Sequence, residues 1–231
     1  MRSGRTPGSA LFYGGKIMDK TPAELRYAKL GPKVAKALQS RYFDAWYVGS
    51  ATEAVEKAFS LIPKTDTVSW GGSLSITELG LTRLAAERGY RVVDRDKGAS
   101  PAERTELMRQ ALLADTYLCG TNALSEDGQL VNIDGNGNRV AAMTFGPRQV
   151  IIVVGMNKVA KTLGDALVRA RTVAAPLNAQ RLAGVKTPCA ETGSCGNCLL
   201  PESICTYIVT TRLCRPAGRI KVILVGANLG L

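Results

Sequence analysis

Short apolar segments alternate with longer amphipathic segments along the chain after residue 20. Continuous apolar runs are typical of parallel strands that are buried on both faces, and the amphipathic segments are typical of the helices that connect such strands. The alternation therefore predicts an α/β fold. The predicted strands are residues 44–49, 67–72, 91–96, 116–119, 149–155 and 220–226, and the predicted helices are residues 21–40, 51–61, 75–88, 101–114 and 157–171, the last of which Pro176 ends.

The alternation changes in the middle of the chain. Residues 129–132 and 139–145 flank the sequence I-D-G-N-G-N, whose Asp-Gly and Asn-Gly pairs favour the tight turn of a β-hairpin. We therefore expect a β-hairpin inserted into the α/β fold.

The chain has 231 residues, of which 45% are hydrophobic, so it can bury one substantial core. We expect a single domain over residues 21–231 and a flexible tail or tag over residues 1–20. Residues 1–20 lack the apolar core of a signal peptide, and no run approaches the ~18 apolar residues of a membrane span. The sequence therefore predicts a cytoplasmic protein with no membrane partner.

Four of the six cysteines, Cys189, Cys195, Cys198 and Cys205, lie in one loop over residues 187–206. Thiolates select zinc, copper(I) or iron–sulfur clusters, and cytosolic thiols stay reduced. Structural zinc sites with four cysteines usually pair two Cys-x-x-Cys knuckles, and this loop has one. The spacing favours an iron–sulfur cluster of the 4Fe-4S type, with zinc and with redox or structural thiols as alternatives. Of the other two cysteines, Cys119 is predicted to lie in the core, and Cys214 is a possible spare ligand.

The charge and the composition restrict the chemistry and the partners. The net charge is +11, which suggests a small anionic partner, but the basic residues are spread among acids and the chain has 13 aromatic residues (Trp 2, Tyr 7, Phe 4), which disfavours nucleic acid. There is no histidine, so Ser–His and Cys–His nucleophile pairs and imidazole ligands are excluded.

Three segments that follow predicted strands carry groups that could bind an anion. Gly71, Gly72 and Ser73 lie between a predicted strand and a predicted helix, where backbone N–H groups can bind phosphate or carboxylate. A glycine turn followed by a serine N-cap would account for the same three residues without a ligand. Glu78 would also complete a capping box with Ser75. The other predicted ligand residues are Asn122, Asp134, Asn136, Arg139 and Lys158. The pairs Asp127-Gly128 and Asp134-Gly135 are also typical of ordinary turns.

These segments resemble the lactate-utilisation (LUD) domain family. The resemblance rests on W-G-G-S-L-S-I-T-E-L-G-L, on G-T-N-A-L-S-E-D-G-Q-L-V-N-I-D-G-N-G-N-R-V, on V-V-G-M-N-K and on the cysteine segment, and it covers residues 20–231. It implies a three-layer α/β/α fold with a mainly parallel sheet, like the ribose-5-phosphate isomerase, glucosamine-phosphate isomerase and CoA-transferase group. It also implies a role in small organic acid metabolism, with an electron-transfer partner protein and a homo-oligomer as possibilities.

Three functions remain open from the sequence. The first is an iron–sulfur-assisted oxidoreductase or lyase that acts on a small hydroxy acid, with Glu78, Asp134 and Lys158 as catalytic candidates and with Arg139 selecting anionic ligands. The second is a non-catalytic subunit or regulatory module in which the metal loop is structural. The third is a metal-free isomerase or transferase that uses carboxylates such as Glu78, Glu126 or Asp134.

Overall fold

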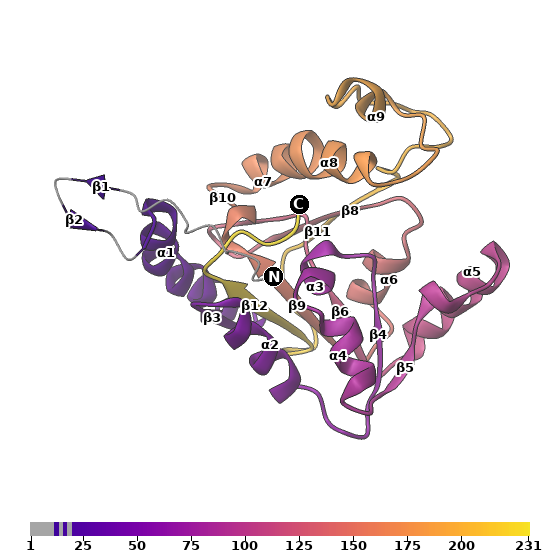
Figure 1. The fold of residues 1–231 in the computed structure, drawn as a ribbon, viewed down its shortest axis with the longest axis horizontal. Helices are drawn as coiled ribbons and strands as arrows, with labels where there is room; N and C mark the ends of the chain where they lie inside the picture. The colour runs from indigo at the N-terminus through magenta and orange to yellow at the C-terminus, as the bar shows by residue number, and fades with distance from the viewer. Residues whose placement is uncertain (1–11, 14–15, 18–19) are drawn as a thin grey trace, which may run out of the picture.

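The computed structural model describes residues 12–13, 16–17 and 20–231, and its centre is a six-stranded sheet (Figure 1). Every pairing in this sheet is parallel, and the strand order is β3-β12-β9-β6-β4-β5. The predicted parallel sheet is therefore confirmed. The strands are β3 (Asp44–Val48), β12 (Ile220–Val225), β9 (Gln149–Gly155), β6 (Thr116–Cys119), β4 (Thr67–Trp70) and β5 (Arg91–Val93).

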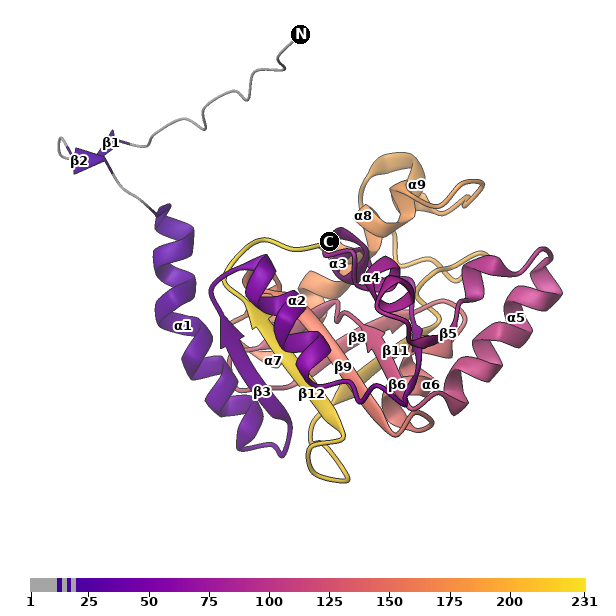
Figure 2. The same ribbon diagram turned by 60° about the horizontal axis from the view of Figure 1, so that its bottom comes forward.

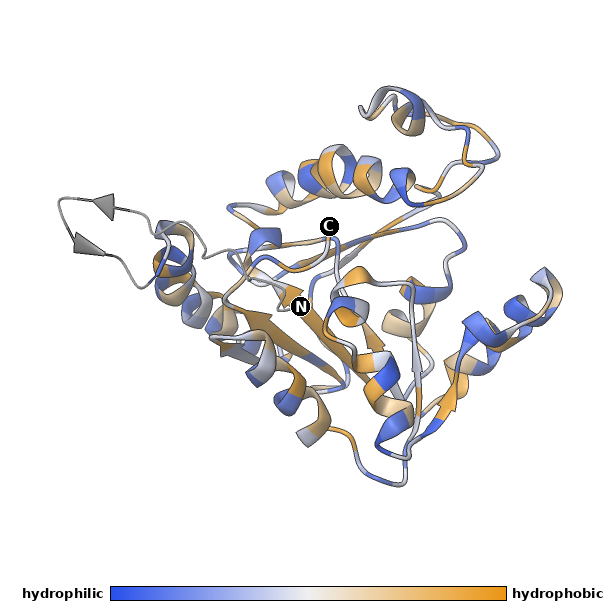
Figure 3. Ribbon diagram, in the orientation of Figure 1, coloured by the Kyte–Doolittle hydropathy of each residue, from blue (hydrophilic) through white to orange (hydrophobic). Residues whose placement is uncertain are grey.

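Helices cover both faces of the sheet, which gives the expected three layers (Figure 2). Alternate residues of β9 explain why, since Val150, Ile152 and Val154 belong to one core cluster and Ile151 and Val153 to the other. The strands at the middle of the sheet, β12 and β9, are consequently mainly apolar, whereas the helices mix hydrophobic and hydrophilic residues (Figure 3). One cluster includes α1 (Pro22–Gln39) and α6 (Asn138–Thr144), and the other includes α2 (Ala51–Ser60), α3 (Leu74–Glu78) and α4 (Leu81–Glu87).

A second, mixed sheet has the order β10-β7-β8-β11. Its hairpin joins β7 to β8 in antiparallel pairing, and the turn contains Gly128 at φ +88°. A Cβ at Gly128 would be 2.7 Å from the backbone of Ala37, so the glycine lets this turn pack against α1. The strands are β10 (Val159–Ala160), β7 (Ala123–Ser125), β8 (Leu130–Asp134) and β11 (Tyr207–Thr211).

The hairpin predicted around residues 133–138 is wrong. Its second strand, 139–145, is the helix α6, and β8 pairs instead with β7 and with the distant β11. Gly137, at φ +79°, begins the helix, and Asp134 Oδ2 accepts a hydrogen bond from the Val140 N–H at 2.9 Å. The glycine and the aspartate that suggested a β-turn therefore start a helix.

Two predicted helices have different bounds in the structure. Residues 75–88 divide into α3 and α4 at Gly80, whose φ is +67°. The predicted capping box of Ser75 and Glu78 is also wrong, because the N-cap position of α3 is Ser73, whose side chain makes no capping hydrogen bond, and Ser75 is buried.

The predicted helix 157–171 begins later and continues further than expected. It starts at α7 (Leu163–Arg169), where Thr162 and Asp165 form a capping box, and runs through a π-helical segment (Ala170–Ala174) into α8 (Ala175–Gln180). Pro176 does not end it: Ala174 and Ala175 keep helical backbone angles, and the π-helical segment directly precedes the proline.

The remaining described elements are short or peripheral. Phe12–Tyr13 (β1) and Lys16–Ile17 (β2) pair with each other, while the rest of the expected tail, apart from Lys20, lies outside the described residues. α5 spans Pro101–Gln110 and α9 spans Pro188–Thr192. None of the described helices has the length and apolarity to cross a bilayer.

Candidate functional site

A pocket of about 530 Å³ lies at the carboxyl edge of the central sheet. It is lined by residues that follow β4, β5, β6 and β9, together with residues of α5, α6 and the segment after α8. Gly71 does not line it but lies close behind, since a Cβ on Gly71 would be 3.3 Å from Arg139 Cδ. The other predicted ligand residues all line this one pocket: Gly72, Ser73, Asn122, Asp134, Asn136, Arg139 and Lys158.

The pocket is cationic. Among the described residues that line it, Asp134 is the one acid, against five basic side chains. Three of the five were not predicted from the sequence. Arg95 follows β5, so the rule that ligands gather after strands could have found it, whereas Arg104 on α5 and Arg181 after α8 carry no such signal.

Arg139 makes its hydrogen bonds within the protein. Nη1 donates to Gly120 O at 3.2 Å and to Asn132 Oδ1 at 2.6 Å, and Nη2 donates to Asn122 Oδ1 at 2.9 Å and to Ile133 O at 2.6 Å. A guanidinium has five N–H donors, and the fifth, on Nε, faces Asp134 Oδ1 at 3.6 Å. Arg139 is thus suited to hold the segments that line the pocket in place rather than to bind a ligand directly.

Lys158 is a buried amine at the base of a strand-to-helix junction. It is 4% exposed, and its Nζ donates to Ser75 Oγ at 3.0 Å. Burial, followed by the positive charges of Arg169 and Arg139, lowers the pKa of Lys158 to about 8, and Glu78 opposes this shift. The amine can therefore be charged or neutral near neutral pH, which suits both anion binding and proton transfer.

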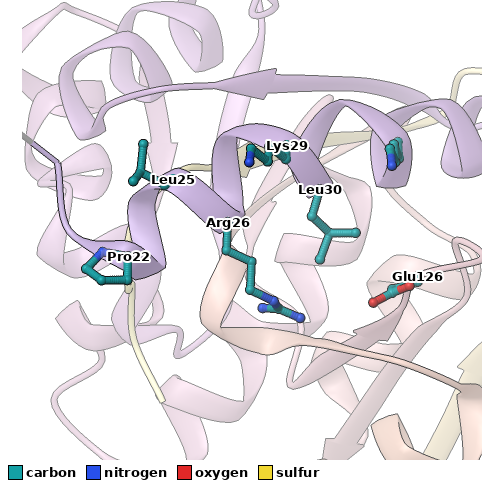
Figure 4. Close-up of a pocket in the computed structure, with 7 residues that line it drawn as sticks. Pro22, Leu25, Arg26, Lys29, Leu30 and Glu126 are labelled. Carbon is teal, nitrogen blue, oxygen red and sulfur yellow. The ribbon is translucent and has the colours of Figure 1, made fainter.

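The other carboxylates considered from the sequence are not in the pocket. Glu78 Oε2 accepts a hydrogen bond from the Gly230 N–H at 2.8 Å. Glu126 pairs with Lys161 at 2.7 Å and lines a separate cavity of about 480 Å³ along α1 (Figure 4). Of the three candidate carboxylates, Glu78, Glu126 and Asp134, it is Asp134 that can act on a ligand in the cationic pocket.

The cysteine loop borders the same pocket. Ile204 lines the pocket, and the next residue, Cys205, packs against the core beneath β7 and β8. Burial, followed by the thiolate charges of Cys189, Cys195 and Cys198, raises the pKa of Cys205 to about 11, so the four sulfur atoms lie near enough to interact electrostatically.

The donor set fits a thiophilic metal centre. All four candidate ligands are sulfur atoms, which zinc and iron–sulfur clusters accept. Within the part of the chain that the structure describes, no three His, Cys, Asp or Glu side chains are already arranged around a common metal position. Cys119 is fully buried in β6, as predicted, and Cys214 is buried, with its sulfur accepting a hydrogen bond from the Ile220 N–H at 3.2 Å.

Comparison with known proteins identifies a family and matches several solved structures, two of which follow. No curated protein matches the sequence. A crystal structure of a DUF162 family protein from Deinococcus radiodurans is 16% identical, with a TM-score of 0.49, over 86% of this chain and 97% of that chain. eIF2B delta from Chaetomium thermophilum is 20% identical, with a TM-score of 0.31, over 48% of each chain. The family model of the LUD domain matches residues 31–225, and the chain therefore belongs to the LUD domain family.

Proposed function

We propose that the protein binds the anion of a small hydroxy acid, of the lactate type, in the cationic pocket, next to a metal centre on the cysteine loop. The observation that carries this proposal is the charge of the pocket: five basic side chains and one acid surround about 530 Å³. An anion would neutralise part of that charge, and clefts of one sign concentrate ligands of the opposite sign.

Lys158 is the residue proposed to contact the ligand's charge. Its amine is buried, and the hydrogen-bond partner it has in the described structure is the neutral Ser75 hydroxyl. A buried ammonium without a carboxylate partner is costly, and a bound anion would remove that cost. Because the pKa of Lys158 is about 8, the same amine can also take or return a proton at the ligand.

The cysteine loop is proposed to hold an iron–sulfur cluster, with zinc as the alternative metal. Such a cluster would supply electron transfer, or Lewis acidity if one iron lacks a thiolate. The support is the all-sulfur donor set together with the position of Ile204, which lines the pocket beside Cys205. Ligand and metal centre would then be neighbours.

Calorimetric titration with L-lactate tests the pocket. The wild type is expected to bind, and Lys158→Gln is expected to weaken binding roughly 10- to 100-fold, because a charge-assisted hydrogen bond is lost. Affinity of the wild type is also expected to fall as pH rises through about 8, where the amine loses its proton. Lys161→Gln is the matched control, since Lys161 is exposed and pairs with Glu126. Absence of lactate binding by the wild type below pH 8 would refute the proposed ligand class.

Metal analysis of protein purified without oxygen tests the cysteine loop. We expect stoichiometric iron and sulfide in the wild type, and loss of most of both in Cys195→Ser and Cys198→Ser, because each change removes one thiolate ligand. Cys119→Ala is the control, because Cys119 is buried in β6, away from the loop. Stoichiometric zinc without iron would show that the loop binds zinc, the alternative metal. The absence of both iron and zinc would exclude a metal centre.

A further inference from the structure

Two arginines in the pocket have donors that the protein does not use. Arg139 donates four hydrogen bonds, whereas Arg95 donates one weak hydrogen bond, to a sulfur atom. Arg95 Nε is buried and has no hydrogen-bond partner in the described part of the chain, where Nη1 donates to the Met108 sulfur at 3.9 Å and to no other atom. Nη2 of Arg95 has no acceptor among the described residues. Unsatisfied buried donors are rare in native proteins and call for a partner.

Arg181 is in a similar position. Its Nε donates to Asn178 Oδ1 at 2.6 Å and its Nη2 donates to Gly72 O at 3.1 Å, while Nη1 has no acceptor in the described part of the chain. Both of these arginines line the pocket, so Nη2 of Arg95 and Nη1 of Arg181 are the donors available to a ligand there.

The two guanidinium groups converge on Gly72. A Cβ on Gly72 would be 2.3 Å from Arg95 Nη2, so the absence of a side chain makes room for that group, while Arg181 binds the carbonyl of the same residue. Burial, and secondarily the positive charge of Arg95, lowers the pKa of Arg181, which is consistent with two like charges close together.

The local acid does not neutralise this cluster. Asp96 lies 3.7 Å from Arg95 Nε, but it also pairs with Arg104 at 2.8 Å, and its side chain is 56% exposed. Arg95 and Arg104 therefore share one carboxylate, and Arg181 lies near enough to Arg95 and Asp96 to interact with both electrostatically. A positive charge of about two remains at this end of the pocket, which is more than a single carboxylate ligand would balance.

We propose that Arg95 and Arg181 form a phosphoryl subsite at Gly72, so that the ligand of the pocket is a phosphorylated small organic acid. The inference rests on the proposed function, which assigns the pocket to an organic acid anion. A phosphoryl group carries close to two negative charges and three acceptor oxygens, so it can accept from two guanidinium forks that approach from different directions. A carboxylate has two oxygens and one charge and is matched by one fork.

Calorimetric titration of the whole protein with L-lactate, with O-phospho-L-lactate and with inorganic phosphate tests the subsite. We expect wild-type protein to bind phospholactate at least about 10-fold more tightly than lactate or phosphate alone. Arg95→Gln and Arg181→Gln should each reduce phospholactate affinity roughly 10- to 100-fold while changing lactate affinity by less than about 3-fold. Arg91→Gln is the matched control, because Arg91 is exposed at the opposite end of β5.

The outcomes separate this inference from the proposed function. Equal affinity for lactate and phospholactate, or equal losses for both ligands in the arginine variants, would overturn the subsite and leave the organic acid pocket standing. Phosphate binding as tightly as phospholactate would overturn the claim that the phosphoryl group belongs to an acid. If the wild type binds no lactate, the proposed function fails, and if it binds no phospholactate either, the subsite fails with it. Arg95→Lys, which keeps the charge, should recover part of the phospholactate affinity if the contact is direct.

Discussion

Replacing Arg139 by leucine is expected to lower the free energy of unfolding by about 3–5 kcal/mol, the range seen when one partner of a buried charged network is removed. The side chain is 12% exposed and ties together β6, β7 and β8. Its loss would leave the acceptors of Gly120, Asn122, Asn132 and Ile133 without this donor. Asn132 would be affected most, because it is fully buried and its Nδ2 already has no hydrogen-bond partner among the residues that the structure describes.

Urea unfolding without any ligand measures this effect. Arg139→Lys should lie between the wild type and Arg139→Leu, because one ammonium cannot reach acceptors on opposite sides of a guanidinium. Arg148→Leu is the control, since that side chain is 87% exposed and its pair with Asp115 is at the surface, so its effect should be below about 0.5 kcal/mol. If Arg139→Leu lowers the free energy of unfolding by less than about 1 kcal/mol, the hydrogen-bond network contributes little to stability. That result would favour the prediction from the sequence that Arg139 contacts the ligand.

The inner strands of the central sheet could be predicted because they are buried on both faces. In β9, Val150–Val154 form an uninterrupted apolar run, which is typical of a strand in a parallel sheet. The segment 133–145 could not be predicted in the same way. Val140, Ala142 and Met143 are buried at spacings that suit either a strand or a short helix, so the glycines before them decided the prediction, and decided it wrongly.

The pocket could be predicted in part for a related reason. Chain segments that follow parallel strands meet at one edge of the sheet, and this places Ser73, Asn122 and Lys158 together without any knowledge of their contacts. Which side chains still have free donors depends on the contacts themselves. Arg139 and Arg95 look equivalent in the sequence, but in the structure Arg139 donates four hydrogen bonds to protein oxygens and Arg95 donates one weak hydrogen bond, to a sulfur atom.

Lys158 is expected to destabilise the protein while no anion is bound, and Lys158→Met should raise the free energy of unfolding at pH 7 by about 2 kcal/mol. The reason is the buried charge: the pKa is about 8 in the folded state, against 10.5 for an ordinary lysine. Below pH 8 the amine is protonated in both states, so the folded state carries the full cost of the buried ammonium.

The sign of the pH dependence follows from proton binding. Between about pH 8 and pH 10.5 the folded protein releases the Lys158 proton and the unfolded chain keeps it. The unfolded state then binds more protons, so the contribution of Lys158 to stability becomes more favourable as pH rises, and the advantage of Lys158→Met should disappear by about pH 10.5. Urea unfolding of the wild type and Lys158→Met at pH 7 and pH 10 measures the difference. Lys161→Met is the control, because the Lys161 side chain is 77% exposed, and its free energy of unfolding should stay within about 0.5 kcal/mol of the wild type at both pH values. If Lys158→Met raises the free energy of unfolding equally at both pH values, methionine stabilises the protein by packing alone. The Lys158 amine is then not a buried charge that an anion could neutralise.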